Sequence, residues 1–141
     1  MSVAEVFGLA LWLAALGQIG LLAVSLQVPT RLHWREELAL LSPFNRKLMW
    51  VYGIFVVLTY LSFATLTAGL HAELLAGDRA AIGLALFIGV YWFARLVVEF
   101  AYFDSRDWPK GKWIQVGHWM LNGLFVFLTV TYLGLVAWRI L

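Results

Sequence analysis

The sequence predicts an all-α fold: an integral membrane bundle of four transmembrane helices. Of its 141 residues, 63% are hydrophobic and only 13% are charged, and the mean hydropathy is +0.86. A soluble domain carries about a quarter charged residues, because its outer surface must face water. The apolar residues also fall into four long runs, separated by charged or turn-forming segments. Lipid is therefore the expected outer solvent, and residues 1–141 are expected to form a single domain.

Each of the four apolar runs has the length that a bilayer requires. A helix needs ~20 mainly apolar residues to cross ~30 Å of hydrocarbon. The expected spans cover about 6–28, 48–70, 80–103 and 114–138.

Turn-forming residues lie between these spans. Pro29 is expected to close the first helix, because proline cannot continue a helical hydrogen-bond ladder. Ser42 followed by Pro43 has the pattern of an N-cap and a first helical residue, so the second helix is expected to begin there. Gly77 with Asp78 marks the second turn, and Trp108-Pro109-Lys110-Gly111 marks the third. Residues 32–41 mix apolar and charged side chains, which suits either a short helix on the membrane surface or a solvated connector.

The distribution of basic residues predicts the orientation. The first and third loops hold most of them: Arg31, Arg35, Arg46, Lys47, Arg106, Lys110 and Lys112. The opposite side holds only Arg79 and Arg139, and the N-terminus before Val6 holds none. Because cytoplasmic loops are enriched in Lys and Arg, both termini are expected outside a cell (inner) membrane.

Two pairs of polar residues lie within the predicted third and fourth spans. Arg95 and Glu99 are four residues apart, as are His118 and Asn122, so each pair shares one helix face. With a rise of ~1.5 Å per residue, Glu99 lies about 6 Å and Arg95 about 12 Å from Phe103. Counted from the other end of the loop, His118 lies about 8 Å and Asn122 about 13 Å deep. Glu99 is therefore expected beside His118, and Arg95 beside Asn122.

This cluster has two interpretations. Gln18 and Tyr52 are expected to join it from the first two helices and complete a polar pocket that opens toward the cytoplasm. It can be a buried ion pair and hydrogen-bond set that fixes helix packing, or it can bind an anionic head group, a quinone, a small solute or a proton. Trp92 and its aromatic neighbours would suit a flat ligand, although such rings more often serve packing.

The remaining polar residues predict no catalytic group and no metal site, and the sequence identifies no cofactor. Cysteine is absent, and His33 with Glu36 and Glu37 fits a solvated face. A net charge of only +2, spread along the chain, argues against a nucleic-acid partner.

Small residues recur at helical spacing on the first and third spans and permit close helix approach, within the bundle or with a partner: Ala10, Ala14, Gly17, Ala81, Ala85 and Gly89. Membrane lipids and either a homo-oligomer or partner membrane subunits are the expected partners.

About ten residues of the third span resemble a known family. Phe93-Ala94-Arg95-Leu96 followed by Tyr102 is similar to the arginine and tyrosine stretch of the membrane-associated eicosanoid and glutathione metabolism family. The resemblance implies a small trimeric transferase or isomerase in which Arg95 and Tyr102 contact glutathione. The sequence departs from the family where Trp50 and Gly53 follow Arg46 in place of asparagine and glutamate.

Three functions are consistent with these observations. The first is a non-catalytic subunit or membrane-embedded binding module for a lipid, a quinone or another small ligand. The second is a membrane transferase of the glutathione or eicosanoid type. The third is a proton or ion pathway.

Overall fold

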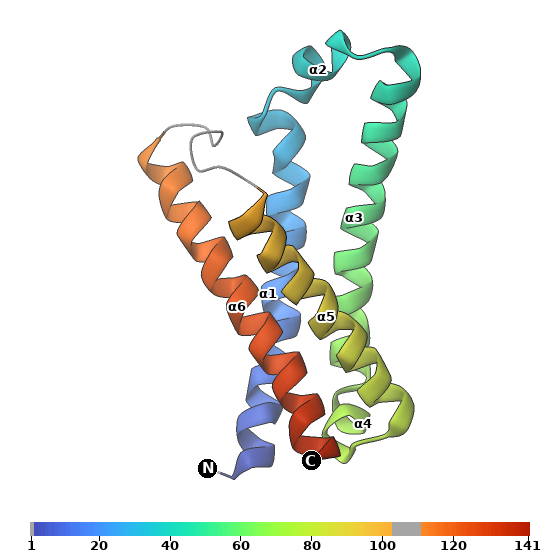
Figure 1. Cartoon of the computed structure of the whole chain (residues 1–141), viewed down its shortest axis with the longest axis vertical. Helices are drawn as coiled ribbons and strands as arrows, with labels where there is room; N and C mark the ends of the chain where they lie inside the picture. The colour runs from blue at the N-terminus through green and yellow to red at the C-terminus, as the bar shows by residue number, and fades with distance from the viewer. Residues whose placement is uncertain (1, 103–110) are drawn as a thin grey trace. The chain divides into compact units, whose positions relative to one another are not determined.

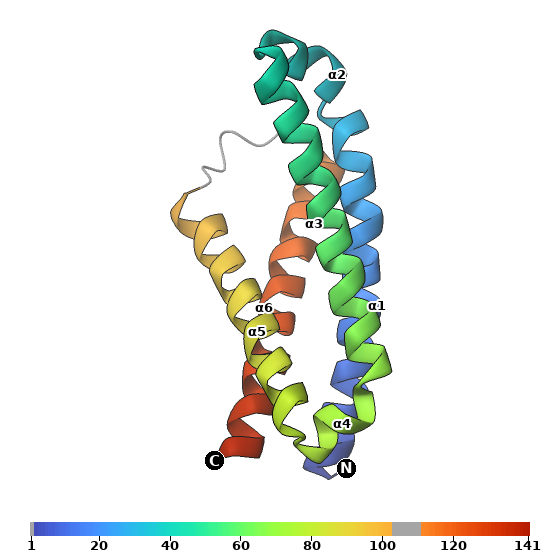
Figure 2. The same ribbon diagram turned by 90° about the vertical axis from the view of Figure 1, so that its right-hand side faces the viewer.

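A computed structural model describes residues 2–102 and 111–141, and these residues are almost entirely helical (Figures 1 and 2). Helix makes up 92% of them and they contain no strand, which confirms the all-α prediction. Three parts of the sequence predictions lie outside the described residues: the third turn at Trp108-Pro109-Lys110, the basic residue Arg106 and the end of the third span at Phe103.

Four long helices account for most of the fold. They are α1 (Val3–Arg31), α3 (Pro43–Gly69), α5 (Arg79–Ala101) and α6 (Lys112–Ile140). Each is long and apolar enough to cross a membrane. Three shorter helices connect them: α2 (Trp34–Glu37), η1 (Leu38–Leu40) and α4 (His71–Ala76). The sequence did not indicate α4 as a separate helix.

The predicted helix start at Ser42-Pro43 and the predicted turn at Gly77-Asp78 are confirmed by the contacts at each position. The Ser42 hydroxyl accepts a hydrogen bond from the Asn45 amide at 3.4 Å, and Pro43 is the first residue of α3. Gly77 ends α4 with a φ of 79°, in the left-handed region that favours glycine. The Asp78 carboxylate then accepts from the Ala81 amide at 3.2 Å and begins α5. Side-chain oxygens at these positions satisfy amides that a helix leaves unpaired at its start.

The prediction that Pro29 closes the first helix is wrong, because α1 continues to Arg31. The proline nitrogen has no hydrogen, so only the helical bond to the Ser25 carbonyl is not made. The next turn still forms, since the Leu32 amide donates to the Val28 carbonyl at 2.9 Å. The connector that follows contains α2 and η1, which confirms a short helical segment there.

The chain divides into two compact units. The first unit comprises Met1–Ala14 with Leu70–Leu141, and the second unit comprises Ala15–Gly69. Helix α1 contributes its first part to one unit and its remainder to the other.

Helices α5 and α6 form the centre of the first unit. They run antiparallel and side by side (Figures 1 and 2). Ala81, Ala85 and Gly89 are all buried, so the small residues of the third span face inward. A Cβ on Gly89 would lie 2.6 Å from Leu133 Cδ2 and 3.2 Å from the Leu133 backbone nitrogen. The absence of a side chain at Gly89 therefore permits the close approach of α6.

At the other end of the first unit, α4 joins the start of α1 to the end of α6. His71 Nε2 lies 2.8 Å from the Gly8 carbonyl oxygen, and its ring stacks on Trp12 at 4.2 Å. Arg139 donates to the Ala76 carbonyl at 2.6 Å. Phe7 stacks on Trp138 at 5.1 Å. These contacts join residues near both ends of the chain.

The second unit contains the rest of α1, the connector and α3, with α2 near the top of Figure 2. Trp34 of α2 packs edge-on against Trp50 of α3, with ring centroids 5.4 Å apart. Leu38 of η1 is buried. The connector is thus held to α3 by apolar side chains.

Candidate functional site

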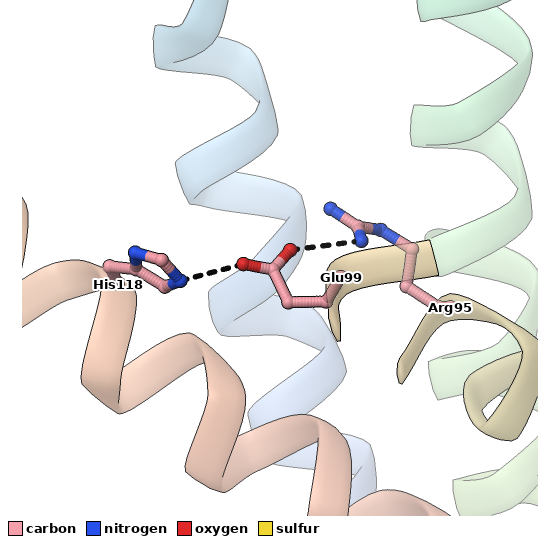
Figure 3. Close-up of polar contacts among 3 residues, drawn as sticks. All are labelled: Arg95, Glu99 and His118. Carbon is pink, nitrogen blue, oxygen red and sulfur yellow. Dashed lines mark hydrogen bonds and ion pairs between the residues drawn. The ribbon is translucent and has the colours of Figure 1, made fainter. Parts of the chain in front are cut away.

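The polar residues of α5 and α6 meet in one cluster, which Figure 3 shows. Arg95 Nη1 lies 3.2 Å from Glu99 Oε2, one helical turn along α5. His118 Nε2, on α6, lies 2.6 Å from the other carboxylate oxygen, Oε1. The predicted pairing of Arg95 with Glu99 and the predicted placement of Glu99 beside His118 are therefore confirmed.

The three side chains differ in exposure. The Glu99 side chain is 3% exposed, whereas Arg95 is 30% and His118 is 23% exposed. The carboxylate is therefore buried, and the guanidinium and imidazole that flank it are partly exposed (Figure 3). Guanidinium groups only donate hydrogen bonds, and an imidazole has two ring nitrogens of which at least one donates. The partly exposed guanidinium is therefore a hydrogen-bond donor, and the imidazole nitrogen that does not face Glu99 donates only when the ring is protonated.

The charge of the cluster depends on the protonation of His118. With a neutral imidazole, one guanidinium and one carboxylate balance each other. With a protonated imidazole, two cations flank a single carboxylate and the cluster carries one net positive charge. His118 Nε2 is close to Glu99 Oε1, but Oε1 takes part in no aligned hydrogen bond among the described residues.

Aromatic rings pack beneath the guanidinium. Arg95 Cζ lies 5.0 Å from the centroid of the Phe125 ring, within the range of a cation–π contact. Phe125 in turn stacks on Trp92, with centroids 5.4 Å apart and an angle of 19° between the planes. Trp92 is completely buried, so its face is occupied by packing and does not offer a surface for a flat ligand.

Asn122 extends the polar face of α6 by one turn beyond His118. It is 8% exposed, and its Oδ1 has no hydrogen-bond partner among the described residues. Leaving a buried acceptor unpaired costs ~1–3 kcal/mol, and such atoms call for an explanation such as a bound ligand or water. Contact between Asn122 and Arg95, which matching depth predicts, stays a prediction.

Gln18 and Tyr52 belong to the second unit. Gln18 is completely buried, whereas Tyr52 is 59% exposed and lines a cavity of that unit. Their predicted participation in the Arg95 cluster stays a prediction.

Two features of the structure were not found from the sequence. Phe125 lies three residues beyond Asn122, so helical periodicity would have placed it on the polar face beneath Arg95. The cavity of the second unit had no sequence signal, because its lining residues are of the same apolar types as those expected to face lipid.

No metal-binding group stands out in residues 2–102 and 111–141, where no three His, Asp or Glu side chains come together closely enough to hold an ion. Tyr102, which the family resemblance pairs with Arg95, directly follows α5 and is 80% exposed.

Comparisons of the chain with protein-family models, with curated proteins and with solved structures find no match.

Proposed function

We propose that this chain is an integral protein of the cell (inner) membrane and binds a small membrane-soluble ligand as a binding module or non-catalytic subunit. The observation that carries the proposal is the arrangement of charge between α5 and α6. A buried carboxylate, Glu99, holds two partly exposed donor groups, Arg95 and His118, in fixed positions.

This arrangement suits a ligand with a hydrogen-bond-accepting oxygen. Arginine offers a rigid fork of donors that matches phosphate and carboxylate oxygens. The imidazole, on the other side of the Glu99 carboxylate (Figure 3), can donate to a second oxygen or to a carbonyl when the ring is protonated. A quinone carbonyl and the head group of an anionic lipid both provide such acceptors. An ionisable cluster inside a predicted span is also, by default, a candidate functional site.

The outer surface supports membrane insertion. Large apolar side chains on the long helices point outward, among them Leu16 at 68%, Phe87 at 61% and Trp119 at 76% exposure. Soluble monomers seldom expose continuous apolar surface on this scale. Lipid, further copies of the chain or partner membrane subunits are the expected cover.

We expect both termini outside and the first loop in the cytoplasm, because the basic residues are concentrated in the first and third loops. Reporter fusions after Leu141 and within the third loop at Lys110 measure this. Activity of a periplasmic reporter at Leu141 and of a cytoplasmic reporter at Lys110 is the expected result. A cytoplasmic reporter that is active at Leu141 would contradict the orientation.

The binding proposal predicts that the purified protein retains a ligand through this cluster. Native mass spectrometry of wild-type protein, released from a mild detergent, is expected to show one additional bound mass. The variant with Arg95→Met and His118→Leu removes both donor groups and is expected to lose this mass. Extraction and analysis of the bound compound would then show whether it is a quinone or a lipid.

A matched control tests whether the loss is specific. Replacing Arg79, an exposed residue at the start of α5, by methionine removes a cation outside the cluster and is expected to leave the bound mass unchanged. Retention of the same mass by a folded Arg95→Met/His118→Leu variant would contradict the proposal. The cluster would then serve only the packing of α5 against α6.

A further inference from the structure

The second unit contains a cavity that the sequence did not indicate. Its volume is about 570 Å³, and residues from the end of α1, from α2 and from the first half of α3 line it. Cavities of ~300–1,000 Å³ hold small organic ligands. The lining includes Pro29, Trp34, Trp50, Gly53 and Val57, so its wall is largely apolar.

Gly53 shapes the wall of this cavity. A Cβ at this position would lie 3.4 Å from the Trp34 ring, so the indole packs directly over the glycine. Ser25 and Pro29 line the opposite wall on α1. Because Pro29 has no N–H, the Ser25 carbonyl does not receive its usual helical hydrogen bond. Tyr52 also lines the cavity.

Basic residues lie next to the cavity along both long helices. On α1, Arg31 is the last residue, follows the lining residue Val28 by three positions and donates to the Gln27 side chain at 3.2 Å. On α3, Arg46 precedes Met49, Trp50 and Gly53 by three, four and seven residues, so it shares their helix face. Arg35 follows Trp34, and Lys47 follows Arg46. Residues 30–47 hold these four basic and two acidic residues, a net charge of +2 with neutral His33.

We propose that this cavity holds one acyl chain of an anionic phospholipid, with the phosphate at the basic residues near the ends of α1 and α3. The net charge of residues 30–47 determines which lipid head group we expect. An acyl chain gains little by moving from bilayer to cavity, because lipid tails are as apolar as the lining side chains. The head group must therefore supply the selectivity. At ~1 kcal/mol per basic side chain near the membrane surface, a net charge of +2 predicts about a 30-fold preference for an anionic over a zwitterionic head group.

This site is independent of the proposed function, because all of its residues belong to the second unit and the Arg95 cluster belongs to the first. The variant that removes Arg95 and His118 is expected to keep the phospholipid. A result that contradicts one of these proposals therefore does not contradict the other.

The test uses the full chain in nanodiscs of equal phosphatidylglycerol and phosphatidylcholine, followed by native mass spectrometry of the lipid that stays bound. Wild-type protein is expected to retain one phosphatidylglycerol, about 30-fold in excess over phosphatidylcholine. Arg31→Gln with Arg46→Gln is expected to reduce this ratio at least tenfold. The control, Arg79→Gln with Lys112→Gln, removes two exposed cations outside the second unit and is expected to leave the ratio unchanged.

A second pair of variants tests the cavity itself. Gly53→Leu fills the space beside Trp34 and is expected to lower the retained phospholipid at least tenfold. Gly20→Leu is the matched control, since Gly20 is an exposed glycine of the same unit whose added Cβ would meet no atom within 4 Å. Equal retention of both lipids by wild-type protein would overturn the proposal, as would retention of a neutral lipid or quinone instead. So would a folded Gly53→Leu protein that binds phosphatidylglycerol as well as Gly20→Leu does.

Discussion

Replacing Glu99 by leucine is expected to destabilise the protein by ~3–5 kcal/mol, because removing one partner of a buried ion pair leaves the other charge uncompensated. Glu99 is the shared partner of Arg95 and His118, so its loss affects two contacts at once. The double variant Arg95→Met with Glu99→Leu is expected to be nearly neutral, since apolar residues of similar size then replace the whole pair. The free energy of unfolding, measured by titration with sodium dodecyl sulfate in mixed micelles, checks both values.

The single variant His118→Leu is the control for the second contact. It removes the only polar contact of Glu99 Oε1 among the described residues but leaves the Arg95 pair intact. We expect a smaller loss than for Glu99→Leu, because Oε1 has no aligned hydrogen bond to lose and the pair with Arg95 remains. Equal and small effects of the Glu99 and His118 variants would show that the carboxylate is solvated, against the 3% exposure of its side chain.

Gly89→Ala is expected to have the second-largest effect, a loss of ~1–3 kcal/mol relative to the same change at an open position. The new Cβ would lie 2.6 Å from Leu133 Cδ2 and 2.9 Å from its Cγ, so α6 or the leucine must move. The control is Gly123→Ala on the exposed side of α6, where an added Cβ meets no atom within 4 Å. Unfolding titrations of both variants in the same micelles give the comparison.

A double variant identifies the cause of that loss. Leu133→Ala vacates the space that the Gly89 Cβ would occupy. Gly89→Ala with Leu133→Ala is therefore expected to be more stable than the sum of the two single effects predicts, by at least ~1 kcal/mol. The Leu133 backbone nitrogen at 3.2 Å remains, so the relief is incomplete. Additive effects would mean that the contact with Leu133 does not limit the approach of α6.

Local patterns accounted for much of the fold. The four apolar runs predicted the four long helices, and Ser42-Pro43 and Gly77-Asp78 predicted helix boundaries. The depths of Glu99 and His118 were predictable because α5 ends and α6 begins at the same loop, and the rise per residue is the same in both helices. Each of these inferences needs only residues close in sequence or a uniform geometry.

Contacts between distant residues could not be predicted in this way. His71 and Gly8, like Arg139 and Ala76, are 63 residues apart, and nothing in either local sequence indicates the other. The role of Trp92 could not be predicted either, because only the folded structure shows its ring stacked on Phe125. Pro29 was misread because a proline in the last turn removes one hydrogen bond without preventing the next.

The division of α1 between the two units has a consequence for biosynthesis. Residues 15–69 are consecutive, so the second unit can assemble as soon as α3 has left the ribosome. The first unit combines residues 1–14 with residues 70–141, and Phe7 can meet Trp138 only after α6 has been made. The start of α1 is therefore made long before its partners in the first unit exist. A nascent chain that ends before α6 would contain the complete second unit, whereas its first unit would lack the central pair of helices.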